Sequence, residues 1–212
     1  MPPYTPAMQN REIELKFPVS DPAALQGLLP QLGFHLDTPR TFEQNTLYDT
    51  PARDLRARTE ILRIRQYGPI WTVTHKRTAR PGDITEPSRY KVRIETETAV
   101  ADGPALGHIF ENLGYRPAFT YEKYRTEWSA IDAATSSTPH LVIDETPIGT
   151  YAELEGPTEW IDRMLAELKI DTSTCLTDSY GKLFLDWKQR TGSAAENLTF
   201  AEVANHDLVA AH

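Results

Sequence analysis

Residues 11–17 read Arg-Glu-Ile-Glu-Leu-Lys-Phe, and their pattern decides how the rest of the chain is interpreted. The residues alternate strictly, so that Glu12, Glu14 and Lys16 fall on one side of an extended strand and apolar residues fall on the other. Such alternation is typical of a strand that buries one face and keeps the other polar. The polar face is fully charged here, and charged faces recur further along the chain.

Seven further segments carry strand signals, and their spacing suits hairpins better than strand–helix–strand units. They are residues 44–48, 61–66, 71–76, 90–98, 121–128, 140–144 and 150–154. Four segments have helical patterns: 21–32, with Ser20 as the expected N-cap and Pro30 as the expected kink or end, and 104–113, 159–169 and 178–188. We therefore predict an α+β protein that is mainly antiparallel β.

A shift of 81 residues aligns the two halves of the chain weakly. It places Ile13-Glu14 on Ile94-Glu95, and the first apolar helical stripe on the stripe of the helix expected at 104–113. This repeat predicts two related halves that close one sheet around a pseudo-twofold axis. Coincidence is the alternative, because apolar stripes recur in any amphipathic helix.

The polar faces of these strands are dense in arginine and glutamate. Residues 89–97 are an example, since Arg89, Lys91, Arg93, Glu95 and Glu97 alternate with apolar residues and threonine. The best-placed side chains form a set of seven cations (Lys16, Arg63, Arg65, Lys76, Arg93, Lys123, Arg125) and seven carboxylates (Glu12, Glu14, Glu95, Glu97, Asp144, Glu153, Glu155).

For any single strand, the simpler interpretation is an outer face in contact with water. For the whole set, the opposite faces are apolar enough to be covered by the four expected helices. That arrangement favours a closed eight-stranded antiparallel β-barrel, a tunnel with a charged lumen and with the helices packed outside.

A lumen that holds both signs of charge suits one kind of ligand. Arginine and lysine bind phosphate oxygens. Clustered carboxylates repel one another and suit a hard divalent cation with oxygen ligands. The sequence thus predicts a site for a metal–polyphosphate complex, in which catalysis depends on positioning and electrostatics.

These residues resemble the CYTH proteins, the triphosphate tunnel metalloenzymes, a superfamily that includes class IV adenylate cyclases, thiamine triphosphatases and inorganic tripolyphosphatases. Residues 12–16 match the ExExK signature of that family. The ELKF string at 14–17 looks closest to the cyclase-type branch, although no His-Phe pair precedes the signature. An ordered series follows: QNTLYD at 44–49, LRIR at 62–65, VTHK at 73–76, RIETE at 93–97, KYR at 123–125, ID at 143–144, ELE at 153–155 and SY at 179–180.

The resemblance implies an eight-stranded tunnel and a role for each charged residue. In that scheme Lys16, Arg63, Arg65, Lys76, Arg93, Lys123 and Arg125 bind the triphosphate. The carboxylates Glu12, Glu14, Glu95, Glu97, Asp144, Glu153 and Glu155 serve one or two Mg²⁺ or Mn²⁺ ions. The candidate catalytic residues are Glu12, Glu14, Lys16 and Lys76.

Composition excludes several other classes of protein. The 212 residues carry a net charge of −8, which argues against a nucleic-acid or membrane-surface partner. The lone Cys175 excludes an internal disulfide and suits a reducing, cytoplasmic location. No apolar run is long enough for a membrane span. The six histidines lack zinc-site spacing, and no glycine-rich phosphate loop is present.

We expect a flexible segment at residues 1–10, a CYTH-like tunnel domain at 11–189 and a tail with a short helix at 190–212. The preferred function is metal-dependent hydrolysis of inorganic or organic triphosphates, such as tripolyphosphate, a nucleoside triphosphate or thiamine triphosphate. One alternative is a class IV adenylate cyclase that converts ATP to cAMP and pyrophosphate. Another is a non-catalytic module that binds polyphosphate or nucleotide. The expected partner is a small-molecule triphosphate, and a homodimer is left open.

Overall fold

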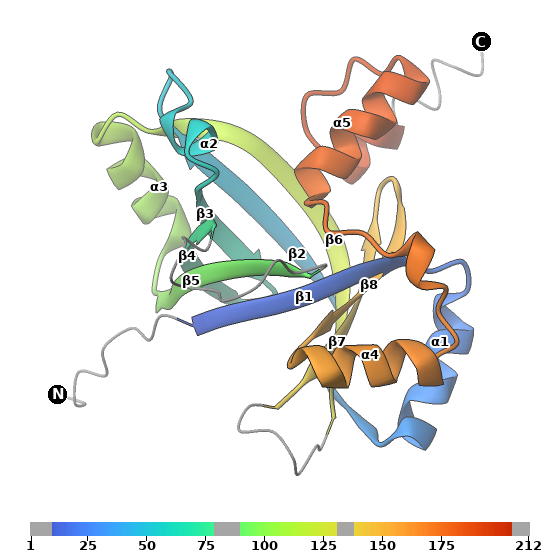
Figure 1. The fold of residues 1–212 in the computed structure, drawn as a ribbon. Helices are drawn as coiled ribbons and strands as arrows, with labels where there is room; N and C mark the ends of the chain where they lie inside the picture. Colours follow the sequence, from blue (N-terminus) through green and yellow to red (C-terminus); the bar gives the residue numbers. More distant parts are fainter. Residues whose placement is uncertain (1–9, 79–89, 131–137, 205–212) are drawn as a thin grey trace, which may run out of the picture.

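The computed structural model describes residues 10–78, 90–130 and 138–204. Its centre is a closed barrel of eight antiparallel strands in the order β1-β5-β4-β3-β2-β6-β7-β8 (Figure 1). The strands are β1 (Asn10–Pro18), β2 (Phe34–Asp49), β3 (Ile61–Tyr67), β4 (Ile70–Thr78), β5 (Lys91–Val100), β6 (Arg116–Ala130), β7 (His140–Thr146) and β8 (Gly149–Glu155). The predicted fold class and barrel closure are confirmed.

The strand order supports the predicted internal repeat. Exchanging β1 with β5, β2 with β6, β3 with β7 and β4 with β8 reproduces the same ring of neighbours. The first helix, α1 (Pro22–Leu28), joins β1 to β2, and α3 (Gly103–Asn112) occupies the equivalent place between β5 and β6. The topology is therefore that of two related halves.

The helices begin and end close to the predicted positions, with local differences. The cap of α1 is Asp21, whose side chain accepts from the Ala24 N–H, instead of the expected Ser20. The α-helix stops at Leu28, shortly before Pro30, because proline cannot continue it. A short 3₁₀ turn, η1 (Leu29–Leu32), follows. The remaining elements are α2 (Asp54–Ala57), which was not predicted, α4 (Thr158–Glu167), η2 (Thr172–Thr174) and α5 (Tyr180–Thr191).

The strands β2 and β6 are much longer than their sequence signals. They pair along nearly their whole length, with register shifts near Leu36, Thr38 and Thr41. The early part of β2 carries exposed residues on both faces, so alternation could not reveal it. Its partner strand is what fixes this part of β2.

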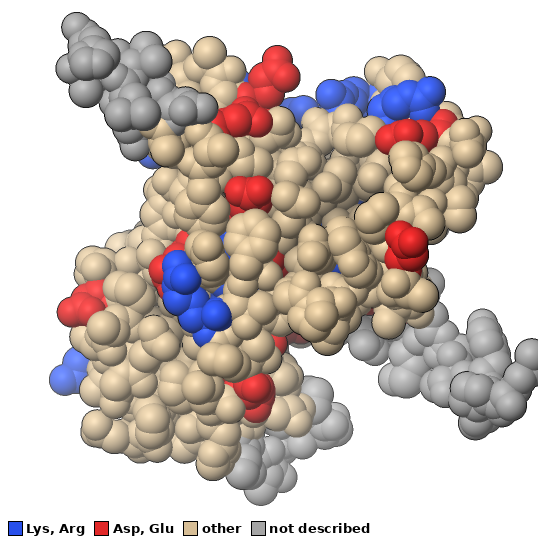
Figure 2. Space-filling model, turned by 180° about the vertical axis from the view of Figure 1, so that it is seen from behind, with Lys and Arg blue, Asp and Glu red and all other residues tan. Residues whose placement is uncertain are grey.

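Charge is spread thinly over the outer surface that faces away from the viewer in Figure 1. Acidic and basic side chains form small separate groups there, and no broad area of one sign covers the described part of this face (Figure 2). No helix in the described ranges is long and apolar enough to span a membrane.

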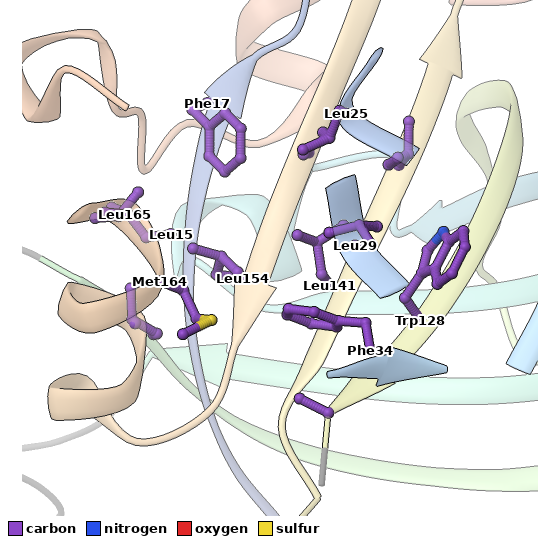
Figure 3. Close-up of a cluster of buried hydrophobic side chains, with 14 of the residues drawn as sticks. Leu15, Phe17, Leu25, Leu29, Phe34, Trp128, Leu141, Leu154, Met164 and Leu165 are labelled. Atoms are coloured by element: carbon purple, nitrogen blue, oxygen red, sulfur yellow. The ribbon is translucent and has the colours of Figure 1, made fainter. Parts of the chain in front are cut away.

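The main hydrophobic core lies outside the barrel. Outward-facing residues of β1, β7 and β8, including Phe17, Leu141 and Leu154, pack against Leu29 and against Leu165 of α4 (Figure 3). Each such side chain contributes roughly 1.5–3 kcal/mol when it is fully buried. Because apolar side chains leave the lumen to cover the outside, the inward positions of the same strands are left for charged residues.

A smaller core holds the C-terminal part of the chain. Tyr180 and Phe184 of α5 pack with Leu198 and Val203, and Phe119 and Tyr121 of β6 lie against them. Residues 200–204 form the short helix expected in the tail, and the Glu202 N–H donates to Thr199 Oγ1, which caps its N-terminus. Residues 1–9 and 205–212, within the two expected terminal segments, lie outside the described ranges.

Candidate functional site

The barrel encloses a charged cavity of about 550 Å³. Six of the seven predicted cations and six of the seven predicted carboxylates line it. They come from β1, β3, β4, β5, β6 and β8, so the strands bring together residues that are up to about 140 positions apart. The two that do not line the cavity are Arg93 and Asp144.

One wall is built from β1, β3, β4 and β5. Lys76 donates to both carboxylate oxygens of Glu12 at 2.8 Å and lies 2.9 Å from Oε2 of Glu95. Arg63 and Arg65 both contact Glu97, at 3.2 and 3.0 Å. Burial alone would lower the pKa of Lys76, but Glu12 and Glu95 raise it above its ordinary value, so its ammonium stays charged.

The facing wall is built from β6, β7, β8 and β1. Arg125 donates through Nε and Nη2 to both oxygens of Asp144 at 2.7 Å, and Lys123 donates to Asp144 Oδ2 at 2.8 Å. Glu153 lies 2.7 Å from Lys16 and 2.9 Å from Arg125. Burial would raise the pKa of Glu153, but Lys16, Arg125 and Lys123 hold it well below the ordinary value.

Asp144 is fully buried behind this wall. Its carboxylate accepts from Lys123, from both Arg125 nitrogens and from the Tyr180 hydroxyl, so its acceptor positions are taken up by protein donors. This geometry suits a residue that orients Lys123 and Arg125. Its predicted role as a metal ligand stays a prediction.

The carboxylates gather where β1 meets β8 and β5. Glu14 is directly opposite Glu155 in the β1–β8 pairing and forms an ion pair with Lys91 of β5. Glu155 makes no ion pair among the described residues. Glu155 lines the cavity at the exposed end of β8. Partial withdrawal from water, together with Glu12, Glu14 and Glu95, raises the pKa of Glu155 to about 8, against the opposing effect of Lys76. This end of the cavity therefore has an excess of negative charge.

The chemistry of these oxygen donors fits Mg²⁺ or Mn²⁺. No three acidic, histidine or cysteine side chains in the described part of the chain already converge as a metal site. Glu12 and Glu14 face Lys76 and Lys91 instead. A divalent ion held by Glu12, Glu14 and Glu155 would therefore replace these ammonium groups, and it would relieve the repulsion that raises the pKa of Glu155.

Several residues of the site were not among the predicted site residues. Lys91 lines the cavity; it was on the charged face of its strand but outside the chosen set. Tyr180 and the neighbouring Ser179 and Gly181 line it as well. Glu43 is fully buried, 3.4 Å from Lys123, and that cation with Arg125 lowers its pKa to about 2 despite burial. The only sequence signal for Glu43 is its i, i+2 spacing from the polar Asn45.

Arg93 points to a different place from the one predicted. Its Nη1 donates to the Thr59 carbonyl at 3.1 Å and to Thr78 Oγ1 at 2.7 Å. It lines a second cavity of about 430 Å³, which shares Leu47, Ile61, Ser179 and Gly181 with the first. This second cavity has apolar walls from Phe119, Phe184 and Leu185, and cations from Arg53, Arg56 and Lys188.

Comparison with known sequences agrees with the geometry. The family model described as the CYTH domain matches residues 10–171. A Methanocaldococcus jannaschii protein with the name "Putative adenylate cyclase" is 28% identical over 160 residues, which is 74% of this chain and 85% of that protein.

Solved structures share the fold at low sequence identity. A Vibrio parahaemolyticus structure described as a "putative adenylate cyclase" has a TM-score of 0.65 at 19% identity and covers 84% of this chain and 99% of its own. A Hippeastrum protein, described as having "a dominant triphophatase activity", has a TM-score of 0.56 at 21% identity, covering 85% of this chain and 96% of its own. The family match spans three quarters of the chain and includes all eight strands of the charged tunnel, and the chain therefore belongs to the CYTH domain family.

Proposed function

We propose that this protein is a divalent-metal-dependent triphosphatase that hydrolyses a phosphoanhydride bond of a triphosphate held inside the barrel. The observation that carries the proposal is the cavity itself, lined by six cations and six carboxylates of the predicted set. Cations alone would suffice to bind an anion. The carboxylates are explained by a second, positively charged ligand that accompanies the triphosphate.

The cations are arranged to hold a chain of phosphates between two walls. Lys76, Arg63 and Arg65 belong to one wall, and Lys16, Lys123 and Arg125 belong to the other. Lys16, Arg63, Arg65 and Lys76 already contact carboxylates of the cavity lining, so phosphate binding there exchanges one anionic partner for another. Lys123 and Arg125 are oriented by the buried Asp144, and they keep that contact. Arginine suits this exchange because its planar fork binds two phosphate oxygens at once.

The metal, when bound, would neutralise phosphate charge and supply an activated water. In this proposal Glu12, Glu14 and Glu155 would hold it. Lys16 and Lys76 would stabilise the charge that develops as the water oxygen attacks phosphorus and the bridging P–O bond breaks. With tripolyphosphate, the products are pyrophosphate and orthophosphate.

Hydrolysis is preferred to cyclisation because the charged residues that line the cavity suit phosphate and metal, and none of them singles out a nucleobase. The triphosphatase activity stated for the Hippeastrum protein points the same way. Adenylate cyclase activity is the second candidate. The names of two relatives favour it, and so does the second cavity, whose apolar wall beside the tunnel is suited to an organic group.

The test is turnover by the purified chain with Mg²⁺ or Mn²⁺ and tripolyphosphate, ATP or thiamine triphosphate as alternative substrates. We expect metal-dependent release of orthophosphate. Formation of cAMP and pyrophosphate from ATP would instead establish the cyclase. Tight binding without turnover of any of the three would replace the enzyme by a binding module.

A further inference from the structure

The wall of the cavity is completed by a segment that lies beyond the family match. That match ends at residue 171, but Ser179, Tyr180 and Gly181 line the cavity. Tyr180 is the first residue of α5, whose cap is the Ser179 side chain. Only 7% of Tyr180 is exposed, so its ring is part of the wall and not of the outer surface.

Tyr180 contacts three charged residues of the site at once. Its hydroxyl donates to Asp144 Oδ2 at 2.6 Å. The Nζ of Lys16 lies 4.0 Å from the centre of its ring, and the Nζ of Lys123 lies 5.0 Å from it. Burial and the nearby Asp144 raise the pKa of Tyr180 well above its ordinary value, so the hydroxyl keeps the proton that it donates.

The backbone before α5 is tied to the same strand that carries Lys16. Lys16 and Leu176 exchange two backbone hydrogen bonds, of 3.1 and 2.7 Å. The Lys16 ammonium also donates to the Asp178 carbonyl at 3.2 Å. On the other side of α5, the fully buried Leu198 exchanges backbone hydrogen bonds with Thr120 and Glu122 of β6. The segments before and after α5 are therefore both tied to strands of the barrel.

An aromatic ring differs from a carboxylate as a partner for a lysine that must bind phosphate. A carboxylate neutralises the ammonium and competes with the phosphate for it. A ring face attracts the ammonium through its quadrupole but leaves the full positive charge available to an anion. Lys16 and Lys123 are almost completely buried. The ring can keep Lys16 oriented while its contact with Glu153 is exchanged for phosphate, and Lys123 keeps its contact with Asp144.

We propose that Tyr180 is a positioning residue, which holds Lys16 and Lys123 beneath its ring and fixes Asp144 through its hydroxyl, so that both lysines stay aimed at a triphosphate. This inference rests on the proposed function, because it assigns Tyr180 a part in binding the same substrate. It also makes α5 part of the active-site wall.

The test compares Tyr180→Phe, which keeps the ring and removes the hydroxyl, with Tyr180→Leu, which removes both. Tyr151→Phe is the matched control, because Tyr151 packs edge-on against Tyr180 and does not line the cavity. Turnover of tripolyphosphate with Mg²⁺ gives kcat and KM, titration calorimetry in EDTA gives the Kd without metal, and thermal unfolding gives Tm.

We expect Tyr180→Phe to weaken tripolyphosphate binding by about tenfold and Tyr180→Leu by on the order of 100-fold, with most of the effect in KM, while Tyr151→Phe stays within about twofold. A purely structural role would lower Tm and leave KM and Kd unchanged in Tyr180→Phe, and that result would overturn the proposal.

A second readout does not depend on turnover. Reductive methylation of the substrate-free protein, followed by mass spectrometry, measures how well Lys16 and Lys123 are shielded. We expect both to react faster in Tyr180→Leu than in the wild-type chain or in Tyr151→Phe. Unchanged reactivity would overturn the proposed contact. If the wild-type chain binds no triphosphate, the proposed function fails, and faster methylation still identifies Tyr180 as the group that orients the lysines.

Discussion

The Nζ atom of Lys76 lies 2.8 Å from each of the two carboxylate oxygens of Glu12. The pair spans two strands that are not neighbours, because β5 lies between β1 and β4. Other oppositely charged side chains of the cavity pair between adjacent strands, such as Lys16 of β1 with Glu153 of β8. Binding of a metal–triphosphate complex then replaces pairs such as Lys76–Glu12 by two new ones, carboxylate with metal and cation with phosphate, whereas Asp144 keeps its contacts with Lys123 and Arg125.

Replacing Arg65 by alanine should weaken tripolyphosphate binding by about 10- to 100-fold, because one charge-assisted contact is lost. Titration calorimetry measures the effect. The control is Arg40→Ala, since Arg40 also pairs with a carboxylate, Glu145, but lies exposed outside the cavity. Equal affinities in the wild-type chain and Arg65→Ala would contradict the placement of substrate in the barrel.

The substitution Glu12→Gln should separate substrate binding from catalysis. It frees Lys76 from its closest anionic partner, so tripolyphosphate should bind several-fold more tightly in EDTA. It also removes a proposed metal ligand, so turnover with Mg²⁺ should fall by on the order of 100-fold or more. Weaker binding in EDTA would contradict the exchange model.

Asp144→Asn should weaken tripolyphosphate binding by about tenfold or more, because Lys123 and Arg125 lose the carboxylate that orients them. Affinity for Mn²⁺ alone, followed by titration, should be unchanged. Asp186→Asn is the control, since it removes an exposed partner of Lys182 on α5. A loss of Mn²⁺ affinity in Asp144→Asn would instead favour the role of metal ligand.

Metal binding should depend on pH through Glu155. Its pKa of about 8 means that the carboxyl is mostly protonated at pH 7, so Mn²⁺ affinity should rise between pH 7 and 9. At pH 7, binding should release about one proton, which calorimetry in two buffers of different ionisation enthalpy detects. Glu155→Gln should lose this release, and equal proton release in both proteins would exclude Glu155.

The raised pKa of Glu155 also makes the stability of the fold depend on pH, and here stability falls as pH rises, whereas metal affinity increases. The pKa of Glu155 is higher in the folded than in the unfolded chain, so folding takes up a proton between the two values. The contribution of Glu155 to stability is therefore greatest below its ordinary pKa and declines as pH rises towards 8. Denaturant unfolding of Glu155→Gln should lack this decline, and an identical pH dependence would contradict the shift.

Leu198→Ala should lower the free energy of unfolding by about 2–5 kcal/mol, because Leu198 is fully buried between α5 and β6. Leu113→Ala is the matched control, since Leu113 is largely exposed. Chemical denaturation measures both. A small effect of Leu198→Ala would show that the tail is not part of the cooperative fold.

The barrel could be predicted because its information is local. Alternation places charged residues on one face of most strands, and closure of the barrel with the apolar faces covered by helices turns that face inward. For β1 by itself an outer polar face was the simpler interpretation, and only the charged faces of several strands together predicted that Glu12, Glu14 and Lys16 face the lumen.

The ion-pair partners could not be predicted, because they depend on register between distant strands. Arg93 belongs to the charged face, but its guanidinium reaches the Thr59 carbonyl at the end of the barrel. Asp144 does not line the cavity, and its carboxylate accepts hydrogen bonds from Lys123 and Arg125, which do. Glu43 stands among neutral neighbours in sequence, and only folding brings four cations close enough to keep it ionised.

The closure of the barrel has a consequence for synthesis on the ribosome. Lys16 of β1 pairs in register with Glu153 of β8, which is 137 residues later. At about 5–20 residues per second, the first strand must wait on the order of ten seconds for its last neighbour to emerge. During that interval, β1 has no partner on the edge that later pairs with β8. The apolar side chains of Leu15 and Phe17, which are buried in the folded protein, must be shielded from water in some other way. A nascent chain would acquire the complete charged site only when this final seam closes.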